Sequence, residues 1–251
     1  MKWPSPQGEC GVIKYIGSPH KYALAEVYRI DENSWNQRSP RETQSQTLKL
    51  VEAVLDGSHQ RGAETEVVDI CKLDIQYCRA CGACYAKGTC IQKDDFPDLF
   101  NKMLSANGIV IGSPVYLNNI SAPLKAMFDR MTDAVHCKML SGKYGCAVST
   151  TSSSGVTDVL SYINYILNRL GVLTVGEVGV AMFSHRGALD SGLSDAASLG
   201  QTLVEAIEAQ RRCPEQERVL AESRERFKIV VQINKDIWPH EYEWWAEKGW
   251  I

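Results

Sequence analysis

Four cysteines lie within thirteen residues of the chain, at the spacing C-x2-C-x2-C-x5-C: Cys78, Cys81, Cys84 and Cys90. Three thiols at such short intervals can converge on one centre, and the fourth follows a turn at Gly88. Thiolates hold a cubane [4Fe-4S] cluster in this way, and the spacing is close to that of compact ferredoxin motifs. Four crowded thiols without a metal would be prone to oxidation. The spacing therefore predicts a metal centre.

Zinc is the main alternative to an iron–sulfur cluster, because four thiolates also suit that ion. Zinc sites usually combine two C-x2-C pairs from separate loops, whereas all four cysteines here share one short segment. The arrangement favours iron and sulfide. The other cysteines are scattered, and we expect them to be buried as small apolar residues; they are Cys10, Cys71, Cys137, Cys146 and Cys213.

The composition is that of an ordinary globular protein, with 44% hydrophobic and 23% charged residues in a chain of 251. A formal net charge of -3 gives no sign of nucleic-acid binding, which usually needs a basic surface. No apolar run reaches the length of a membrane span, and no signal-type apolar core follows the N-terminus. We expect a cytoplasmic protein that contacts neither membrane nor nucleic acid.

Strand and helix patterns alternate between residues 45 and 182, which indicates a parallel sheet with crossover helices. The predicted strands are 65–70, 108–112, 144–149 and 172–182, with a first strand at 23–30 or, alternatively, at 11–16. The predicted helices are 46–55, 96–104, 122–135 and 156–170. Further helices at 199–211 and 216–235 precede an aromatic tail at 238–250, which we interpret as a packing or subunit-contact segment.

Three polar segments could hold a cofactor. Residues 39–47 run into a helix, whose N-terminal N–H groups and hydroxyls suit a phosphate, although helix capping alone would also explain them. The loops 112–119 and 149–155 leave the carboxyl ends of strands, where open α/β sheets bind ligands. Tyr116 in the first of these loops could lie against a flat ring.

The sequences SPRETQSQT and GSPVYLNNISAPLKAMFDR, with the cysteine run between them, resemble the iron–sulfur flavoproteins of the flavodoxin-like NAD(P)H-dependent FMN reductase superfamily over residues 39–185. The resemblance implies an α/β fold: a doubly wound five-stranded parallel sheet that binds FMN at its strand ends. It also implies a [4Fe-4S] cluster on Cys78, Cys81, Cys84 and Cys90. One departure is Arg38, where the family usually has glycine. The family resemblance further implies that the phosphate is held by Ser39, Arg41, Gln44, Ser45 and Thr47, and that the isoalloxazine meets Pro114, Val115, Tyr116, Asn118 and Asn119, with Ser149, Thr150, Thr151, Ser152 and Ser153 nearby.

These patterns divide the chain into an N-terminal extension with the first strand (1–38), an FMN domain (39–192) with the cysteine loop (78–90), and a C-terminal helical and aromatic extension (193–251). We expect a flavin-dependent oxidoreductase that exchanges electrons between a ferredoxin-like carrier and an acceptor reduced at the flavin. No side chain need act as the principal acid or base. NAD(P)H is a further candidate donor, and a homodimer or homotetramer is expected.

Two alternatives to this function stay open. One is a cluster-free NAD(P)H-dependent FMN enzyme that reduces quinones, azo or nitro compounds. The other is a non-catalytic electron carrier or redox sensor, in which the cluster acts as a switch.

Overall fold

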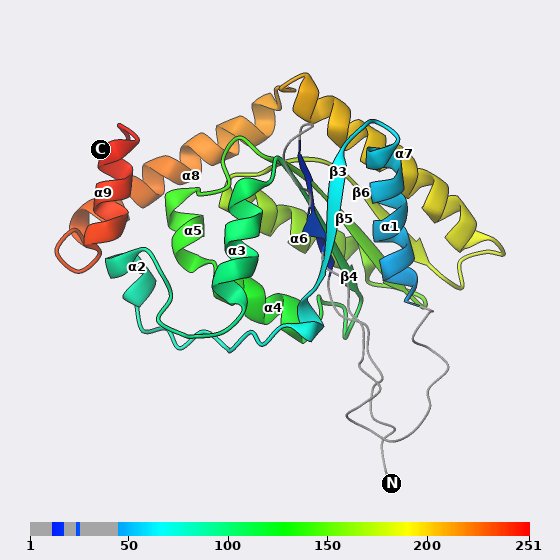
Figure 1. The fold of residues 1–251 in the computed structure, drawn as a ribbon, viewed down its shortest axis with the longest axis horizontal. Helices are drawn as coiled ribbons and strands as arrows, with labels where there is room; N and C mark the ends of the chain where they lie inside the picture. Colours follow the sequence, from blue (N-terminus) through cyan, green and yellow to red (C-terminus); the bar gives the residue numbers. More distant parts are fainter. Residues whose placement is uncertain (1–11, 18–23, 26–44) are drawn as a thin grey trace, which may run out of the picture.

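The computed structural model describes residues 12–17, 24–25 and 45–251, and shows one α/β sandwich (Figure 1). In these residues six strands form one sheet of order β3-β1-β2-β4-β5-β6. The strands are β1 (Val12–Gly17), β2 (Leu24–Ala25), β3 (Glu64–Asp69), β4 (Gly108–Pro114), β5 (Tyr144–Thr151) and β6 (Leu173–Ala181). A short 3₁₀ turn, η2 (Ile70–Lys72), follows β3.

Helices cover both faces of the sheet. They are α1 (Gln46–His59), α2 (Ala83–Lys87), α3 (Phe96–Ser105), α4 (Ala122–Asp129), α5 (Thr132–Cys137), α6 (Val156–Leu170), α7 (Ala188–Glu208), α8 (Pro214–Ile233) and α9 (Pro239–Glu247). Helices α1 and α7 pack together on one face, while α3, α4 and α6 lie on the other (Figure 1). None of the helices in the described ranges combines the length and the apolarity needed to cross a bilayer.

The centre of the sheet is parallel and buried on both faces. Strand β4 pairs with β5, and β5 with β6, all in the same direction. Every residue of β4 is buried, as are all but the last residue of β5. Such strands read as continuous apolar runs, which is why the sequence identifies them without ambiguity. Their carboxyl ends share one edge of the sheet.

The sequence predicted a sheet of five parallel strands, and this prediction is wrong for β1. That strand runs antiparallel to both β3 and β4. This strand corresponds to the alternative prediction at 11–16. Within the preferred range 23–30, Leu24 and Ala25 form β2 and pair in parallel with β4, and residues 26–30 lie outside the described part. A local apolar pattern predicts that a strand exists but contains no information on its direction.

The single helix predicted at 122–135 is two helices. Helix α4 ends at Asp129 and α5 begins at Thr132, whose hydroxyl donates to the Asp129 carbonyl at 3.0 Å. Arg130 stands at the break, and its side chain is buried rather than exposed. The apolar periodicity continues through this break, so the sequence pattern alone does not reveal it.

Helix α7 begins at Ala188, eleven residues before the predicted start at 199. It approaches α1 so closely that a Cβ atom on Gly200 would lie 1.7 Å from the Val54 carbonyl oxygen. The Ser58 hydroxyl bridges the two helices by donating to the carbonyl oxygens of Val54 (2.8 Å) and Gly200 (3.1 Å). Glycine and alanine form much of this contact, which leaves too weak an apolar pattern to predict the first turns of α7.

The C-terminal helices return to the cysteine segment. Helix α8 runs along the top of the molecule to α9, and α9 lies against α2 and α5 (Figure 1). A second small core here contains Cys137, Val231 and Trp245, all buried. The Trp244 indole N–H donates to the Cys137 carbonyl at 3.0 Å. The end of the chain therefore packs against the region that bears the candidate metal ligands.

Candidate functional site

The N-terminus of α1 meets the carboxyl end of β5. Ser45 is the N-cap of α1, and its hydroxyl accepts from the Leu48 N–H at 3.1 Å. Thr47 is fully buried, and its hydroxyl is hydrogen-bonded to that of Thr150. Two predicted cofactor segments, more than a hundred residues apart, are thus in direct contact. Three other predicted phosphate ligands lie outside the described residues: Ser39, Arg41 and Gln44.

The loop after β4 is a tight turn. Tyr116 and Asn119 exchange two backbone hydrogen bonds, each of 2.9 Å. The central residues Leu117 and Asn118 are both left-handed, with φ of 48° and 58°. Asparagine tolerates that conformation, but leucine does so only at a cost in strain, and Leu117 is fully exposed. Strained backbone of this kind often marks a functional loop.

The serine-rich loop after β5 lies against this turn. The Val115 N–H donates to the Thr150 carbonyl at 2.9 Å. A Cβ atom on Gly155, whose φ is +86°, would lie 2.6 Å from Asn118 Oδ1. Glycine therefore permits the close approach of the two loops. The Thr151 hydroxyl is engaged within its own loop by the Ser154 carbonyl, at 2.7 Å.

Ser149 provides a test of whether this edge suits a cofactor. Its side chain is fully buried, yet its hydroxyl has no hydrogen-bond partner among the described residues. A buried polar group without a partner costs about 1–3 kcal/mol, so it calls for one that the described residues do not supply. Together with the helix terminus of α1, this edge offers donors to a phosphate and to a polar ring, which fits FMN.

The predicted ring-contact residues line the same edge. Pro114 is buried at the end of β4, and the turn from Tyr116 to Asn119 follows it directly. Ser152 and Ser153 are exposed, and the Ser152 carbonyl accepts from the Phe183 N–H at 3.1 Å. The structure thus brings all of the described candidate flavin residues to one end of the sheet.

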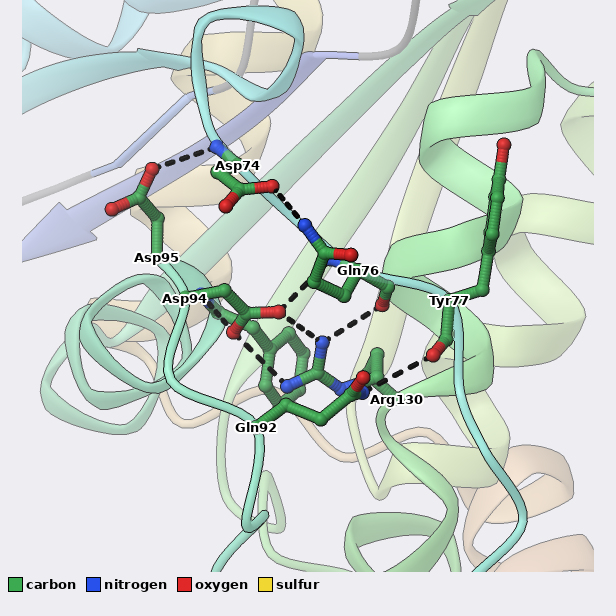
Figure 2. A network of polar contacts seen from close by, with 8 residues as sticks. Asp74, Gln76, Tyr77, Gln92, Asp94, Asp95 and Arg130 are labelled. Atoms are coloured by element: carbon green, nitrogen blue, oxygen red, sulfur yellow. Dashed lines mark hydrogen bonds and ion pairs between the residues drawn. The ribbon is translucent and has the colours of Figure 1, made fainter.

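The cysteine segment forms a loop whose two arms are joined at its base. The Asp74 N–H donates to Asp95 Oδ2 at 2.7 Å, and the Asp95 N–H donates to the Asp74 carbonyl at 2.9 Å. Closer to the cysteines, the Gln92 amide donates to the Tyr77 carbonyl at 3.1 Å (Figure 2). This bond joins the residue before Cys78 to a residue that lies two positions after Cys90.

Inside the loop the backbone is tightly wound. Ala80, Gly82 and Gly88 are all left-handed, and the short helix α2 lies between the two glycines. The Ala80 N–H donates to Cys78 Sγ at 3.4 Å. Hydrogen bonds of this kind to ligand sulfurs help to set the potential of iron–sulfur centres.

The four thiols differ in their surroundings. Cys78 and Cys81 are exposed, whereas Cys84 and Cys90 are half-buried. Burial raises the pKa of the Cys84 thiol to about 12, and the carboxylate of Asp133 adds to the effect. In the described residues no three cysteine, histidine or acidic side chains are close enough to hold a single metal ion.

The aromatic tail packs on the cysteine loop of its own chain. The Tyr85 ring lies 5.0 Å from that of His136 and 4.8 Å from that of Trp238, between centroids. Glu241 is fully buried, and its carboxylate accepts from His136 Nδ1 at 3.0 Å. The sequence indicated a packing or subunit-contact role for the tail but not its partners, because the contacts join positions more than a hundred residues apart and leave no local signal.

A buried ion pair also supports the cysteine loop. The Arg130 guanidinium donates to both carboxylate oxygens of Asp94, and to the Gln76 carbonyl at 2.8 Å (Figure 2). Burial opposes the charge on Asp94, but the bonds from Arg130 and from the Gln76 N–H hold the pKa of that carboxyl below its usual value. The carboxylate also accepts from the Phe96 N–H at 3.3 Å, so helix capping is only part of its role.

Comparison with known proteins agrees with this geometry. The family model described as NADPH-dependent FMN reductase matches residues 39–185. An iron-sulfur flavoprotein of Archaeoglobus fulgidus is 32% identical over 95% of this chain and 99% of its own length. Another iron-sulfur flavoprotein, from Methanosarcina thermophila, is 34% identical over 55% of this chain and 74% of its own.

Solved structures agree at the level of the fold. A flavone reductase structure matches with a TM-score of 0.54 at 19% identity, over 68% of this chain and 60% of that one. The match to the Archaeoglobus protein covers so much of the chain that it includes most of residues 193–251. The matched sequence therefore extends into the C-terminal helices of this chain.

Proposed function

Since this chain belongs to the NADPH-dependent FMN reductase family, and within it to the iron-sulfur flavoproteins, we propose that it passes electrons between a one-electron carrier and an acceptor reduced at FMN. The family makes it a flavin-dependent oxidoreductase. The type of cluster, the carrier and the assembly described below are our proposal. A bound flavin supplies two-electron or one-electron chemistry, and a [4Fe-4S] cluster supplies one-electron exchange.

The observation that carries the proposal is the presence of two distinct sites on one chain. One end of the sheet presents the buried Ser149 hydroxyl, which has no partner in the part of the chain that the structure describes, beside the Thr47–Thr150 pair. The other site is the closed loop with four thiols, whose backbone donates to Cys78 Sγ. We assign the cluster to Cys78, Cys81, Cys84 and Cys90, and the phosphate and ring to the residues at the sheet edge.

Charge around the cysteine loop supports a protein carrier as partner. Residues 77–93 contain Arg79, Lys87 and Lys93 and no carboxylate, and all three cations are exposed. The thiols of Cys78 and Cys81, on the same segment, are also exposed to solvent. An acidic one-electron carrier of the ferredoxin type would be attracted to this surface, with a rate that falls as ionic strength rises.

The positions of the two sites support a homo-oligomer. Helix α2 lies at the end of the molecule near α9, whereas the N-terminus of α1 lies on the other side of the sheet (Figure 1). Electrons would have to cross the width of the sandwich within one chain. We propose a dimer or tetramer in which the cysteine loop of one subunit approaches the sheet edge of another.

Anaerobic purification followed by iron, sulfide and flavin analysis tests the cofactor assignment. We expect iron and sulfide with FMN in the unaltered protein, and FMN alone in Cys84→Ser. Cys213→Ser is the matched control, because Cys213 is also half-buried but lies at the start of α8. Zinc in the four-cysteine site, or iron that survives Cys84→Ser, would contradict the cluster. Flavin without iron in the unaltered protein would favour the cluster-free NAD(P)H-dependent alternative.

Mixed oligomers test the path between subunits. One preparation carries Cys84→Ser, and the other carries a double change, Thr47→Val and Thr150→Val, that weakens the flavin site. We expect carrier-dependent activity to return when the two are unfolded, mixed and refolded together. Activity that never exceeds the sum of the separate preparations would contradict transfer between subunits, and a monomer in sedimentation would exclude the assembly.

A further inference from the structure

The outward face of helix α8 changes character along its length. In the N-terminal half this face is charged, and Arg218 and Glu222 form an ion pair there at 2.8 Å. In the C-terminal half the same face carries Ile229 and Ile233, which are 60% and 76% exposed. Ile237, in the turn that follows α8, is 64% exposed. A solvated helix face is normally polar, so a group of exposed isoleucines marks a surface for contact with another molecule.

The opposite face of α8 is already packed within the chain. Ser223 and Val231 are buried, and Phe227 packs against the second small core. These three residues recur every fourth position and form the inward stripe of the helix, which leaves Ile229 and Ile233 on the outward side. Figure 1 shows α8 along the outer rim of the molecule. Among the described residues nothing covers the outward side, because both isoleucines are exposed.

Two exposed charges flank the isoleucines at equal spacing. Arg226 lies three residues before Ile229, and Asp236 lies three residues after Ile233. Neither Arg226 nor Asp236 has an ion pair or a hydrogen-bonded side-chain partner among the described residues. A cation and an anion therefore stand at mirror positions about the midpoint of the isoleucine pair, and both lack a partner in their own chain.

This symmetry fits two copies of α8 that run antiparallel about a two-fold axis. With the axis at the midpoint of the pair, Ile229 faces Ile233 of the partner subunit, and Arg226 faces the partner subunit's Asp236. The same two contacts then occur twice, as in any two-fold interface. A parallel arrangement would instead set the two arginines against each other, and the two aspartates likewise, which is unfavourable.

We propose that the outward face of α8 binds α8 of a second copy of this chain in antiparallel orientation, with Ile229 and Ile233 at the centre and an Arg226–Asp236 ion pair at each end. Contact removes the isoleucines from water, and the ion pairs fix direction and register. The interface uses neither the cysteine loop nor the sheet edge, so it goes beyond the proposed function and does not rest on it. Together with the contact of loop and sheet edge it would build a tetramer.

Charge reversal at the two ends tests the pairing. The full-length protein is purified anaerobically with its cofactors, and sedimentation equilibrium gives its mass. Arg226→Asp sets a second carboxylate against the partner subunit's Asp236, and Asp236→Arg sets two cations together. We expect each change to raise the dissociation constant at least about tenfold. The double variant Arg226→Asp/Asp236→Arg exchanges the signs and restores both ion pairs, so we expect the mass of the unaltered protein to return.

Rescue by the double variant has no route within one chain. Positions 226 and 236 are separated by about 15 Å along a helix, which is too far for an ion pair. Ile233→Lys tests the apolar centre, and we expect it to halve the mass. Tyr165→Lys is the matched control, because Tyr165 is a similarly exposed residue, at 58%, on α6, and we expect it to leave the mass unchanged.

A monomeric unaltered protein would overturn the inference, since the face would then serve another partner. A double variant that stays dissociated would overturn the pairing of Arg226 with Asp236. An oligomer whose mass is unchanged in Ile233→Lys and in both charge reversals would refute this interface but not the contact between cysteine loop and sheet edge. Iron, sulfide and flavin are measured in every preparation; an unaltered oligomer without iron would refute the cluster and leave this inference standing.

Discussion

The imidazole ring of His240 packs against Gly88, so closely that a Cβ atom at position 88 would lie 2.4 Å from His240 Cε1. Gly88 ends α2 with φ of 70°, a conformation that glycine adopts freely. This contact fixes α9 to the cysteine loop at a point between Cys84 and Cys90. The C-terminal helices thus form one wall of the candidate cluster site.

Replacing Gly88 with alanine is expected to loosen this wall. The left-handed backbone costs an alanine about 1–2 kcal/mol, and the methyl group must also displace His240. We expect a lower free energy of unfolding in urea and a lower iron content after purification. Gly142→Ala is the control, since Gly142 has φ of +83° with no atom within 4 Å of the added Cβ. If the two variants lost equal amounts of stability and iron, the displacement of His240 by the methyl group would have no measurable effect.

How much of this could be predicted from the sequence depends on the range of the interactions. The buried runs of β4 and β5 are local patterns, and each predicted its strand correctly. The cysteine spacing is also a local pattern, and the metal centre that it indicates stays a prediction. The contact of Gly88 with His240 and the pair of Arg130 with Asp94 join separate elements, so only the folded chain reveals them. The direction of β1 is likewise decided by its neighbours, β3 and β4, and not by its own residues.

The Thr47–Thr150 pair predicts a non-additive effect on stability. Thr47→Val leaves the buried Thr150 hydroxyl without its partner, at a cost of about 1–3 kcal/mol, and Thr150→Val does the reverse. We expect the double variant to be more stable than the sum of the single changes, in urea unfolding of the flavin-free protein. FMN affinity, measured by fluorescence titration, should fall in all three. Thr202→Val is the control, because that hydroxyl is exposed on α7 and bonds only within its helix. Strict additivity would argue against a coupled pair.

Leu117 predicts a stabilising substitution. It is fully exposed and left-handed, so its side chain gains nothing from burial while its backbone is strained. Leu117→Gly should raise the free energy of unfolding by up to about 1 kcal/mol. Val219→Gly, at an exposed position within α8, should lower it by about the same amount, because glycine there weakens a regular helix. A loss of stability in Leu117→Gly would show that the leucine side chain has a partner in the assembled protein.

We expect the buried amine of Lys138 to make the stability of the protein depend on pH. Its side chain is buried beside the Phe227 ring, and its amine donates to the carbonyl oxygens of Val135 (2.9 Å) and Arg169 (3.0 Å). Burial, followed by the nearby cations Arg169 and Arg224, lowers the pKa of Lys138 from 10.5 to about 7. Between these two values the unfolded chain binds a proton that the folded chain has released.

The unfolding free energy should therefore rise with pH across this window, and this gain should be lost as pH falls from 10.5 to about 7, with a slope of at most about 1.4 kcal/mol per pH unit. Lys138→Met removes the titrating group, so the difference in unfolding free energy between wild type and variant, from urea titrations of the flavin-free protein at pH 6 to 10, isolates its contribution. We expect the unfolding free energy of the wild type to increase relative to that of Lys138→Met as pH rises. A difference that stays constant would show that the amine is protonated in the folded protein throughout, and that its two carbonyl bonds outweigh its burial.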